Sequence, residues 1–378
     1  MKIIIDENVP LGNEFFGDLG EIQQLPGRKI TAADVKDADI LIIRSVTKVN
    51  AALLEASNVK FIGTCTIGID HLDIDYLAQR QIVWANAPGC NANSVVEYVY
   101  AVLASLDVNW THLNFGIIGC GNVGGRLYRC LKSQNVNLRC YDPNLPQSTI
   151  PELTDLKSVL DCDIVSMHTP LITNGPNPSY HLLKKEQLLQ LKHGAVLINA
   201  GRGPVIDNQD LLAVLAERTD LRLVLDVWET EPDISIPLLN EVVIGTPHIA
   251  GYSFDGKLNG TEMIYQALCK FLNVTPDKNL SNLVPVLANN ILDTGHLTES
   301  WSIVKHLILQ AYNVESDYMR LKEAAHDSLE KKNLINDGFD LLRKHYPKRR
   351  EFHNYQVSYH HANQALKDWL SKLGFNCA

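Results

Sequence analysis

The sequence lacks the features of a membrane or secreted protein. No run approaches the ~18 consecutive apolar residues that a membrane-spanning helix needs. The N-terminal segment, 1–6, reaches an acidic residue too early for a signal peptide. The eight cysteines are scattered without a C-x-x-C pair, which suits reduced thiols better than a disulfide framework or a zinc site. We therefore expect a cytoplasmic protein with no membrane contact and no metal ion.

An excess of positive charge is also missing. The chain carries 34 Lys and Arg against 43 Asp and Glu, a net charge of −9. Nucleic-acid-binding proteins normally show a basic face, so we expect no nucleic-acid partner. A local basic pocket for an anionic substrate remains compatible with this balance. With 378 residues, 46% of them hydrophobic and 20% charged, the chain has a globular composition and predicts two or three domains.

The most informative stretch lies between residues 114 and 142. A short apolar run, Phe115–Ile118, predicts a buried strand, and a G-x-G-x-x-G motif follows at Gly119–Gly124. A helix is predicted over 125–131, and a second strand over 138–141 delivers Asp142. A strand before the glycines, a helix after them and an acid further on are the context that a dinucleotide-binding site requires. The stretch therefore predicts a nucleotide cofactor.

Each part of this motif has a physical task. Gly119 permits the tight turn, Gly121 lets the backbone approach a pyrophosphate, and Gly124 lets the helix pack closely on the strand. The pyrophosphate binds unpaired N–H groups at the helix N-terminus, where the helix dipole favours negative charge. A carboxylate at Asp142 accepts from the ribose hydroxyls and repels a 2′-phosphate, which favours NAD over NADP. Asp142 could also start a turn with Pro143, and one residue can serve both purposes.

Strand and helix patterns alternate through most of the chain. Helices are expected near 51–57 and 74–80, then at 95–106 with a capping box of Ser94 and Glu97, and later near 184–191 and 259–272. This alternation predicts parallel sheets covered by helices. The expected strands are Ile3–Ile5, Ile40–Ile43, Phe61–Gly63 and 82–84 in the first part, and 115–118, 138–141, 164–167, 195–199, 223–227 and 242–244 in the second.

The last hundred residues change character. Strand alternation stops, and long helical patterns appear at 301–312 and 316–331. The fold class we predict is α/β, with two Rossmann-like doubly wound parallel-sheet domains and a C-terminal, mainly helical α+β domain. The expected boundaries are 1–93, completed by 252–279, for a substrate-binding domain, 94–251 for an NAD-binding domain, and 280–378 for a domain whose apolar faces need a partner.

Three charged or titratable residues follow strands of the second sheet. Histidine suits the removal of a hydroxyl proton because its pKa lies near neutrality, and His248 lies in a Pro-His turn. A carboxylate such as Glu231 would orient the ring, and a guanidinium such as Arg202 grips a substrate carboxylate bidentately. Each has a structural alternative taken singly, because the chain has 13 histidines and both other residues could be surface groups. The hypothesis rests on all three following strands of a cofactor-binding sheet.

Across residues 1–275 the chain resembles the D-isomer-specific 2-hydroxyacid dehydrogenases. The matching segments are Gly119–Gly124, Asn199–Gly203, Asp226–Pro232 and Pro247–Gly251. The N-terminal segment 1–8, the pair 43–47 and 63–68, and the helical tail with 339–343 and 346–352 point to a branch of the family that acts on a phosphorylated hydroxy acid. The loop at 173–181 is longer than in the wider family.

The resemblance implies roles for individual residues. Arg202, Glu231 and His248 would be the catalytic trio, with His248 as the acid–base group. The tail would form a homodimer. The remaining implied contacts are Gly119, Gly121, Asn122, Val123, Gly124, Asp142, Thr169, Asp226 and Gly251 for the cofactor, and Arg44, Ser45, Thr66 and Tyr252 for the substrate. A distal phosphate needs donors and positive charge, and Arg44, Ser45 and Thr47 are candidates because they meet at one strand end.

Other interpretations stay open at this level. A dehydrogenase of another 2-hydroxy acid, such as 3-phosphoglycerate or D-lactate, would share the whole trio. A corepressor or redox sensor that binds the cofactor without turnover is a different class, and an intact Arg202, Glu231 and His248 argue against it. The tail could also be a regulatory ligand-binding domain.

Overall fold

The computed structural model describes residues 1–284, 287–331, 335–360 and 363–377. The chain divides into two compact units. The first unit combines Met1–Asn91 with Tyr252–Val286, and the second combines Ala92–Gly251 with Leu287–Ala378. The chain therefore passes from one unit to the other more than once, and the C-terminal segment belongs to the same unit as the predicted NAD-binding region.

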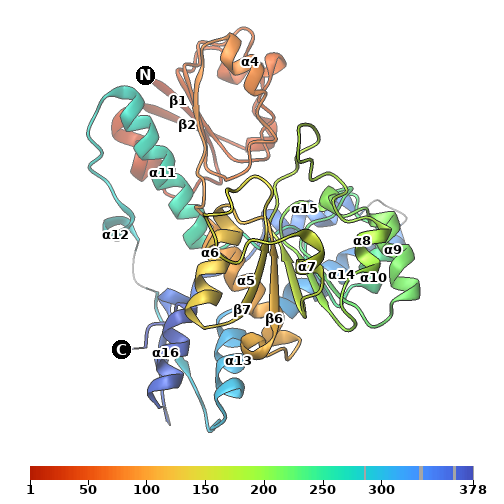
Figure 1. Cartoon of the computed structure of the whole chain (residues 1–378). Coiled ribbons are helices and arrows are strands. Elements are labelled where there is room, and N and C mark those ends of the chain that lie inside the picture. The colour runs from red at the N-terminus through yellow and green to blue at the C-terminus, as the bar shows by residue number, and fades with distance from the viewer. Residues whose placement is uncertain (285–286, 332–334, 361–362, 378) are drawn as a thin grey trace. The chain divides into compact units, whose positions relative to one another are not determined.

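The first unit is a parallel sheet with the strand order β2-β1-β3-β4-β5. Alternate side chains of each strand point to opposite faces. Helix α11 lies along one face of the sheet (Figure 1). Its Ile264 and Leu268 belong to the same hydrophobic cluster as Ile3 and Ile5 of β1. The other face packs against α2, α3 and α4. The bounds are β1 Lys2–Asp6, α1 Gly12–Phe16, β2 Glu21–Leu25, α2 Ala32–Val35, β3 Ile40–Ile43, α3 Ala51–Leu54, β4 Phe61–Thr64, α4 Ile74–Gln79, β5 Val83–Ala85, α11 Phe254–Leu272 and α12 Leu280–Leu283.

Two elements of the first unit differ from the sequence prediction. Strand β2 was not predicted because it is a polar edge strand, largely exposed, with no apolar run. Helix α11 begins at Phe254, five residues before the predicted start at Asn259, where Ser253 accepts a hydrogen bond from the Gly256 N–H. Glycine argues against a helix locally, yet a Cβ at Gly260 would lie 2.6 Å from the Cys65 carbonyl oxygen. Close packing therefore explains the glycine.

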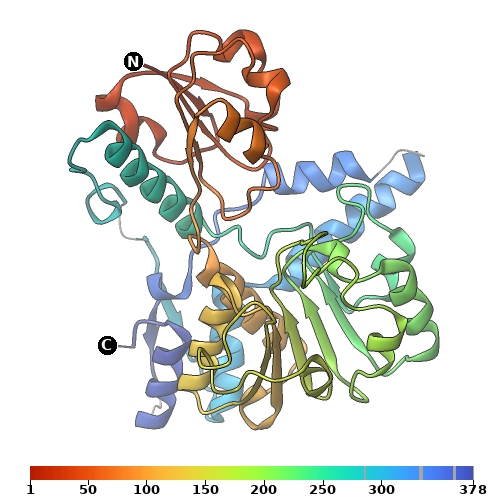
Figure 2. The ribbon, with the colours of Figure 1, turned by 45° about the horizontal axis from the view of Figure 1, so that its top comes forward.

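The second unit is a parallel sheet with the strand order β11-β10-β9-β8-β6-β7, the doubly wound arrangement that was predicted. Figure 2 shows its strands with helices along both faces. The bounds are α5 Ala92–Ser105, β6 Asn114–Ile118, α6 Asn122–Ser133, β7 Asn137–Tyr141, α7 Leu156–Leu160, β8 Ile164–Met167, α8 Lys185–Leu189, β9 Val196–Asn199, α9 Asn208–Glu217, β10 Arg222–Leu225, α10 Ile236–Glu241 and β11 Ile244–Gly245.

The predicted capping box at Ser94 and Glu97 is wrong. Helix α5 begins at Ala92, so both residues lie inside it and both are buried. The Ser94 hydroxyl donates to the Ala250 carbonyl oxygen, and the Glu97 carboxylate accepts from the backbone N–H of Phe352. Both partners are distant in sequence, so a local pattern could not reveal them.

The C-terminal segment is mainly helical, as predicted, and it completes the core of the second unit. Leu321, Ile335 and Phe339 are fully or almost fully buried in the same hydrophobic cluster as Trp228 and Leu238. Two short strands pair in parallel beside these helices. The bounds are β12 Ile291–Asp293, α13 Ser300–Ala311, α14 Val314–Lys331, α15 Asn336–Lys344, β13 Gln356–Ser358 and α16 Gln364–Leu373.

Two global properties complete the description. In the described part of the chain, no helix combines the length and the apolar character needed to cross a bilayer. All eight cysteines are free thiols, and most of them are buried.

Candidate active site

His248 and Glu231 form a hydrogen-bonded pair. Nδ1 of His248 lies 2.7 Å from Oε2 of Glu231, and the second carboxylate oxygen accepts from the Trp228 N–H at 2.8 Å. Burial alone would raise the pKa of Glu231, but the nearby His248 and these hydrogen bonds outweigh it and lower that pKa below its usual value. The carboxylate is therefore a fixed anion that orients the ring, and Nε2 is the nitrogen left to exchange a proton with a substrate.

Asp226 holds the loop that carries His248. Its buried carboxylate accepts from the Thr246 hydroxyl at 2.7 Å and from the backbone N–H groups of Ile249 and Ala250 at 2.8 and 3.0 Å. Its carbonyl oxygen accepts from the His248 N–H at 2.7 Å. His248 itself has φ 56°, a left-handed conformation that is uncommon outside glycine. These bonds hold the residue in that conformation, so Asp226, a predicted cofactor contact, also supports the loop that carries His248.

Arg202 lies in the loop after β9, next to the loop after β10 that carries Glu231. The two strands are neighbours in the sheet. A Cβ at Gly203 would lie 1.9 Å from the Trp228 carbonyl oxygen, so only glycine allows the loops to approach so closely. The Arg202 guanidinium donates to the Gly201 carbonyl oxygen at 2.9 Å. The structure thus brings the segments of the predicted trio to adjacent strand ends.

The glycine motif forms the predicted strand–turn–helix. Gly119 has φ 84°, and a Cβ there would contact Thr169 at 2.8 Å. A Cβ at Gly124 would lie 1.9 Å from the Gly119 carbonyl oxygen, so the close packing of helix on strand requires glycine at this position. The backbone beside Gly121 faces open space, and no side chain caps helix α6, which begins at Asn122. Its first N–H groups, including that of Val123, are therefore suited to a pyrophosphate.

Asp142 starts a turn, which is one of the two roles that the sequence left open. Its Oδ2 accepts from the Cys120 N–H at 2.9 Å, and its Oδ1 accepts from the Asn144 N–H at 3.0 Å. The carboxylate thus ties the end of β7 to the glycine turn and starts the turn that follows. It also places a negative charge beside the motif, where a ribose would bind.

Two buried polar atoms next to the glycine turn have no partner among the described residues. They are Oγ1 of Thr169 and Nδ1 of His168. Burial lowers the pKa of His168 to about 3, so the ring is neutral, and its Nε2 lies 2.9 Å from the Ser166 hydroxyl. An unsatisfied buried hydroxyl costs free energy, so the Thr169 oxygen is a suitable hydrogen-bonding group for a cofactor.

In the first unit, Arg44 binds a buried carboxylate. Its Nε donates to Oδ2 of Asp6 at 2.9 Å, and Nη2 lies 3.5 Å from Oδ1. Nη1 has no partner among the described residues, which leaves one donor group for an anion. The Thr47 hydroxyl is buried and donates to the Gly27 carbonyl oxygen at 2.9 Å, so Thr47 is unsuited to the phosphate role predicted for it. Ser45 is exposed.

The other predicted substrate residues also lie in the first unit. The Thr66 hydroxyl lies 2.9 Å from that of Thr64, which in turn lies 3.0 Å from Nε2 of His71. Burial lowers the pKa of His71 to about 4, so this group of hydroxyls is joined to a neutral ring. Tyr252 is the residue at which the chain returns to the first unit, and Nζ of Lys257 lies 4.8 Å from the centroid of its ring.

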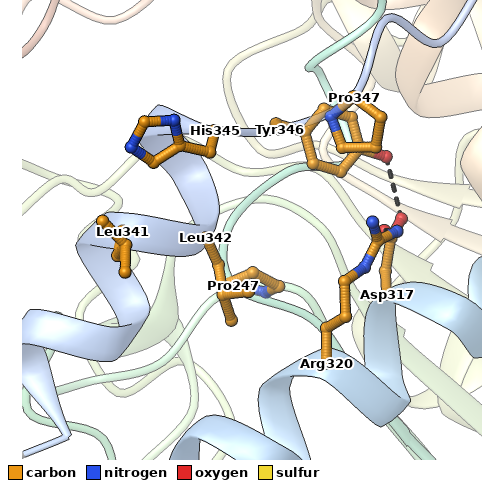
Figure 3. A pocket seen from close by; sticks show the side chains of 8 residues that line it. All are labelled: Pro247, Asp317, Arg320, Leu341, Leu342, His345, Tyr346 and Pro347. Atoms are coloured by element: carbon orange, nitrogen blue, oxygen red, sulfur yellow. Dashed lines mark hydrogen bonds and ion pairs between the residues drawn. The ribbon is translucent and has the colours of Figure 1, made fainter.

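A cavity of about 280 Å³ borders the loop that carries His248 (Figure 3). Pro247 contributes to it from the loop, and the rest of the lining comes from α14, α15 and the residues after α15. The Tyr346 hydroxyl donates to the Asp317 carboxylate at 2.8 Å. None of the predicted site residues lines this cavity, so it is a feature of how the C-terminal segment packs on the loop.

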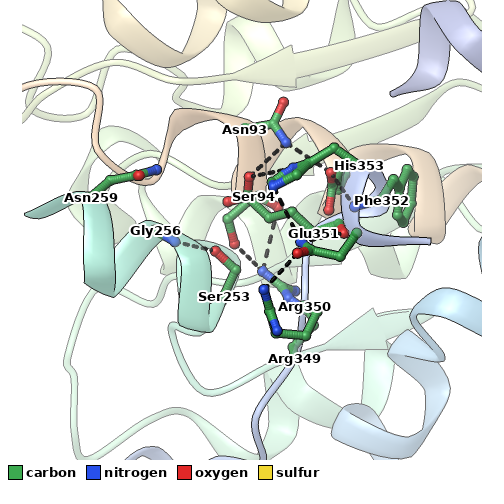
Figure 4. Close-up of polar contacts among 12 residues, drawn as sticks. Asn93, Ser94, Ser253, Gly256, Asn259, Arg349, Arg350, Glu351, Phe352 and His353 are labelled. Carbon is green, nitrogen blue, oxygen red and sulfur yellow. Dashed lines mark hydrogen bonds and ion pairs between the residues drawn. The ribbon is translucent and has the colours of Figure 1, made fainter. Parts of the chain in front are cut away.

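The C-terminal segment also contacts the loop through a buried arginine (Figure 4). The Arg349 guanidinium donates to the Ser94 hydroxyl and to the Ala250 carbonyl oxygen, the latter at 2.6 Å. It lies over the ring of Tyr312 at 4.1 Å. Asn93 donates to both Glu97 and Glu351 at 2.8 Å. The partners of Arg349 come from distant segments of the chain, so a local sequence pattern does not reveal that this arginine is buried.

Sequence reasoning also missed a cluster formed by His181, Asp207 and Glu229, whose ligand-type atoms all lie within 4.8 Å of one another. Glu229 lies two residues before the predicted Glu231, and Asp207 precedes a helix in the manner of an N-cap. Glu229 and Asp207 could each be noticed from the local sequence. Their contact with His181 could not, because it depends on the path of the long loop at 173–181.

Comparison with known proteins assigns the family. Residues 103–250 match the family described as D-isomer specific 2-hydroxyacid dehydrogenase, NAD binding domain, and residues 283–374 match a family described as a domain of unknown function. The chain is 62% identical over 377 residues to the erythronate-4-phosphate dehydrogenase of Cellvibrio japonicus, covering 100% of both chains. It is 47% identical to the protein of that name from Teredinibacter turnerae, covering 95% of both.

Solved structures show the same fold. The NAD⁺-bound 3-phosphoglycerate dehydrogenase of Entamoeba histolytica is 25% identical, with a TM-score of 0.62 over 72% of this chain and 95% of that one. The D-lactate dehydrogenase of Aquifex aeolicus, at 23% identity and a TM-score of 0.60 over 72% of this chain and 96% of that one, supports the fold alone. The chain therefore belongs to the D-isomer specific 2-hydroxyacid dehydrogenases and, among them, to the family of the curated erythronate-4-phosphate dehydrogenases.

Proposed function

We propose that this chain oxidises 4-phospho-D-erythronate to 2-oxo-3-hydroxy-4-phosphobutanoate with NAD, a step in pyridoxal 5′-phosphate (vitamin B6) biosynthesis. The observation that carries the proposal is the 2.7 Å pair of His248 and Glu231 in a chain 62% identical to a protein named for this activity. A ring held at Nδ1 by an anion has Nε2 available as the acid–base nitrogen, which is what oxidation of a hydroxyl group requires.

The proposed roles follow from the contacts described above. NAD supplies the acceptor for the hydride that leaves C2, and the fitting groups are the N-terminus of α6, Asp142 and the unpartnered Thr169 hydroxyl. His248 takes the proton of the 2-hydroxyl group at Nε2, so the C2–O bond becomes a carbonyl. Glu231 stabilises the imidazolium that results. Arg202 binds the substrate carboxylate and polarises the developing carbonyl.

The distal phosphate is assigned to Arg44 and the exposed Ser45. Arg44→Ala should raise the KM for the phosphorylated acid by roughly tenfold or more, since a charge-assisted hydrogen bond is lost, and leave the KM for NAD unchanged. Arg44→Lys keeps the positive charge but not the planar guanidinium, so its KM for the phosphorylated acid should lie between those of the wild type and Arg44→Ala. Because Arg44 also binds Asp6, whose side chain is fully buried, thermal unfolding must be measured alongside. Equal effects on both KM values would contradict the assignment.

The homodimer is proposed to form through residues 287–378. The proposal assigns Met319 and Leu341 to the interface, two large apolar side chains of this segment that are 54% and 57% exposed. Light scattering of the intact chain should give twice the monomer mass. Met319→Glu combined with Leu341→Glu should yield a monomer that keeps its helical content, and a soluble, unchanged dimer would place the interface elsewhere.

The test of the activity is NADH formation from three acids: 4-phosphoerythronate, 3-phosphoglycerate and D-lactate. Each is assayed with and without an added 2-oxo acid as acceptor. Turnover with 4-phosphoerythronate alone supports the proposal, and a requirement for the acceptor would mean that the cofactor is reoxidised in place. Activity on another of these acids instead would move the substrate assignment, and absence of turnover together with NADH-dependent DNA binding would favour a corepressor.

A further inference from the structure

His181 ends the long loop at 173–181 in a constrained position. Its φ is 50°, in the left-handed region, and its ring stacks on that of Tyr180 with centroids 3.9 Å apart. Its backbone N–H donates to the Pro204 carbonyl oxygen at 2.8 Å, two residues after Arg202. A left-handed backbone is retained in a non-glycine residue when the surrounding contacts determine it, and such positions cluster at functional sites.

The imidazole of His181 lies between two carboxylates. Nε2 is 2.5 Å from Oε1 of Glu229, and Nδ1 is 3.1 Å from Oδ2 of Asp207. The three side chains are only 15–21% exposed. Nε2 is hydrogen-bonded to the Glu229 carboxylate, and Nδ1 lies within ion-pairing distance of the Asp207 carboxylate. The ring therefore has a carboxylate at each of its two nitrogens.

Each carboxylate also holds backbone. Oδ1 of Asp207 accepts from the N–H groups of Gln209 and Asp210 at 3.0 and 3.1 Å and so caps helix α9. Oε2 of Glu229 accepts from the Asn208 N–H at 3.0 Å. The three residues therefore join the end of the long loop, the start of α9 and the loop that leads to Glu231.

The same loop reaches the cofactor side of the sheet. Nδ2 of Asn177 donates to Oδ1 of Asn144 at 3.1 Å, and the Asn144 N–H is bound by Asp142. His181 itself contacts both neighbouring segments. Its backbone N–H binds Pro204 in the segment of Arg202, and its ring binds Glu229 in the segment of Glu231.

We propose that His181 is a positioning residue for the reaction: its ring and backbone N–H join the loops of Arg202 and Glu231 so that Glu231 keeps His248 aligned. The inference rests on the proposed function, because it assigns a support to that same trio. A displacement of about 1 Å in an aligned site can cost up to roughly 100-fold in rate. The ligand types would also suit a divalent cation, but a carboxylate already lies at each ring nitrogen, which favours the positioning role.

The experiment compares His181→Gln with the matched control His193→Gln in the full-length protein. His193 has a 90% exposed side chain, and its only ionic neighbour in the described structure is Asp220 at 4.0 Å. His181→Gln should lower kcat by roughly 10- to 100-fold while the Kd for NADH stays within about twofold. His181→Arg, which can serve two carboxylates, should recover part of kcat. The double variant His181→Gln/Glu229→Gln should have a kcat no lower than that of the less active single variant, because the two residues act through one contact.

Hydrogen exchange provides a readout that needs no substrate. In His181→Gln the Trp228 amide, which donates to Glu231, should lose protection, whereas amides of β6 should keep theirs. This separates the inference from the identity of the substrate, because exchange reports the positioning role even if the wild type oxidises none of the acids tested.

Three outcomes would overturn the inference. One is an unchanged kcat and unchanged exchange at Trp228. Another is a fall in NADH affinity and melting temperature as large as the fall in kcat, which indicates a general structural role. The third is stoichiometric Zn²⁺ binding in equilibrium dialysis that the wild type shows and His181→Gln lacks, which would make the cluster a metal site.

Discussion

The acid–base role of His248 gives the most direct prediction at the scale of single residues. His248→Ala should lower kcat by roughly 10²- to 10⁴-fold, the usual contribution of a positioned acid–base group. NADH should still bind, because the glycine turn and helix α6 are separate from this loop in the sheet. Fluorescence titration of NADH checks the second expectation, with His193→Ala as a control at an exposed position. Near-normal turnover would exclude His248 as the acid–base group.

His168 links stability to pH. Burial lowers its pKa to about 3 from an ordinary 6.5, so the folded protein keeps it neutral while the unfolded chain binds a proton below about pH 6.5. Stability is therefore lost as the pH falls from about 6.5 towards 3, and the contribution between pH 7 and pH 5 is about 2 kcal/mol. Urea unfolding at both pH values should show a smaller difference for His168→Gln than for the wild type. His193→Gln should behave like the wild type, and three identical differences would refute the assignment.

The positions of single residues at strand ends were predictable, but the long-range contacts that support them were not. His248, Glu231 and Arg202 could be predicted because each follows a strand, and strand ends converge in parallel sheets. The second role of Asp226, the support that Arg349 gives to Ala250, and the contacts of His181 all depend on partners far away in sequence. Those pairings are set by tertiary structure, which local patterns do not contain.

At the scale of elements, Asp142 should control both the glycine turn and the choice of cofactor. Asp142→Asn keeps an oxygen that can accept from the Cys120 N–H but removes the charge, so it should raise the preference for NADP by about tenfold with little loss of NAD binding. Asp142→Ala loses the acceptor as well and should weaken both cofactors. Titrations with NADH and NADPH check the pair. Identical behaviour of the two variants would show that the turn does not depend on this hydrogen bond.

Buried strands were predicted more accurately than edge strands and the first residues of helices. The inner strands of both sheets are short apolar runs, and all were found within a few residues of their true bounds. Strand β2 is a polar edge, and α5 and α11 begin earlier than their local patterns suggest. Edge strands carry little hydrophobic signal, and helix starts depend on capping partners that local patterns identify poorly.

At the scale of the whole molecule, the C-terminal segment is part of the core of the second unit. Phe339→Ala removes a fully buried ring from the cluster around Trp228 and should cost about 3–5 kcal/mol. Leu189→Ala, in helix α8 at a 41% exposed position, is the control and should cost little. Thermal unfolding of both variants tests this, and equal melting temperatures would show that the segment packs as a separate domain. A truncation near residue 280 should be insoluble for the same reason.

The late position of this segment has a consequence for synthesis. The last strand of the large sheet ends at Gly245, whereas Leu321 and Phe339, which cover the neighbouring core, are translated much later. A nascent chain that stops before them exposes apolar surface, and such surface attracts chaperones and proteases. A prematurely terminated or nicked product would therefore be removed rather than persist as a half-active enzyme that holds NAD without turning it over.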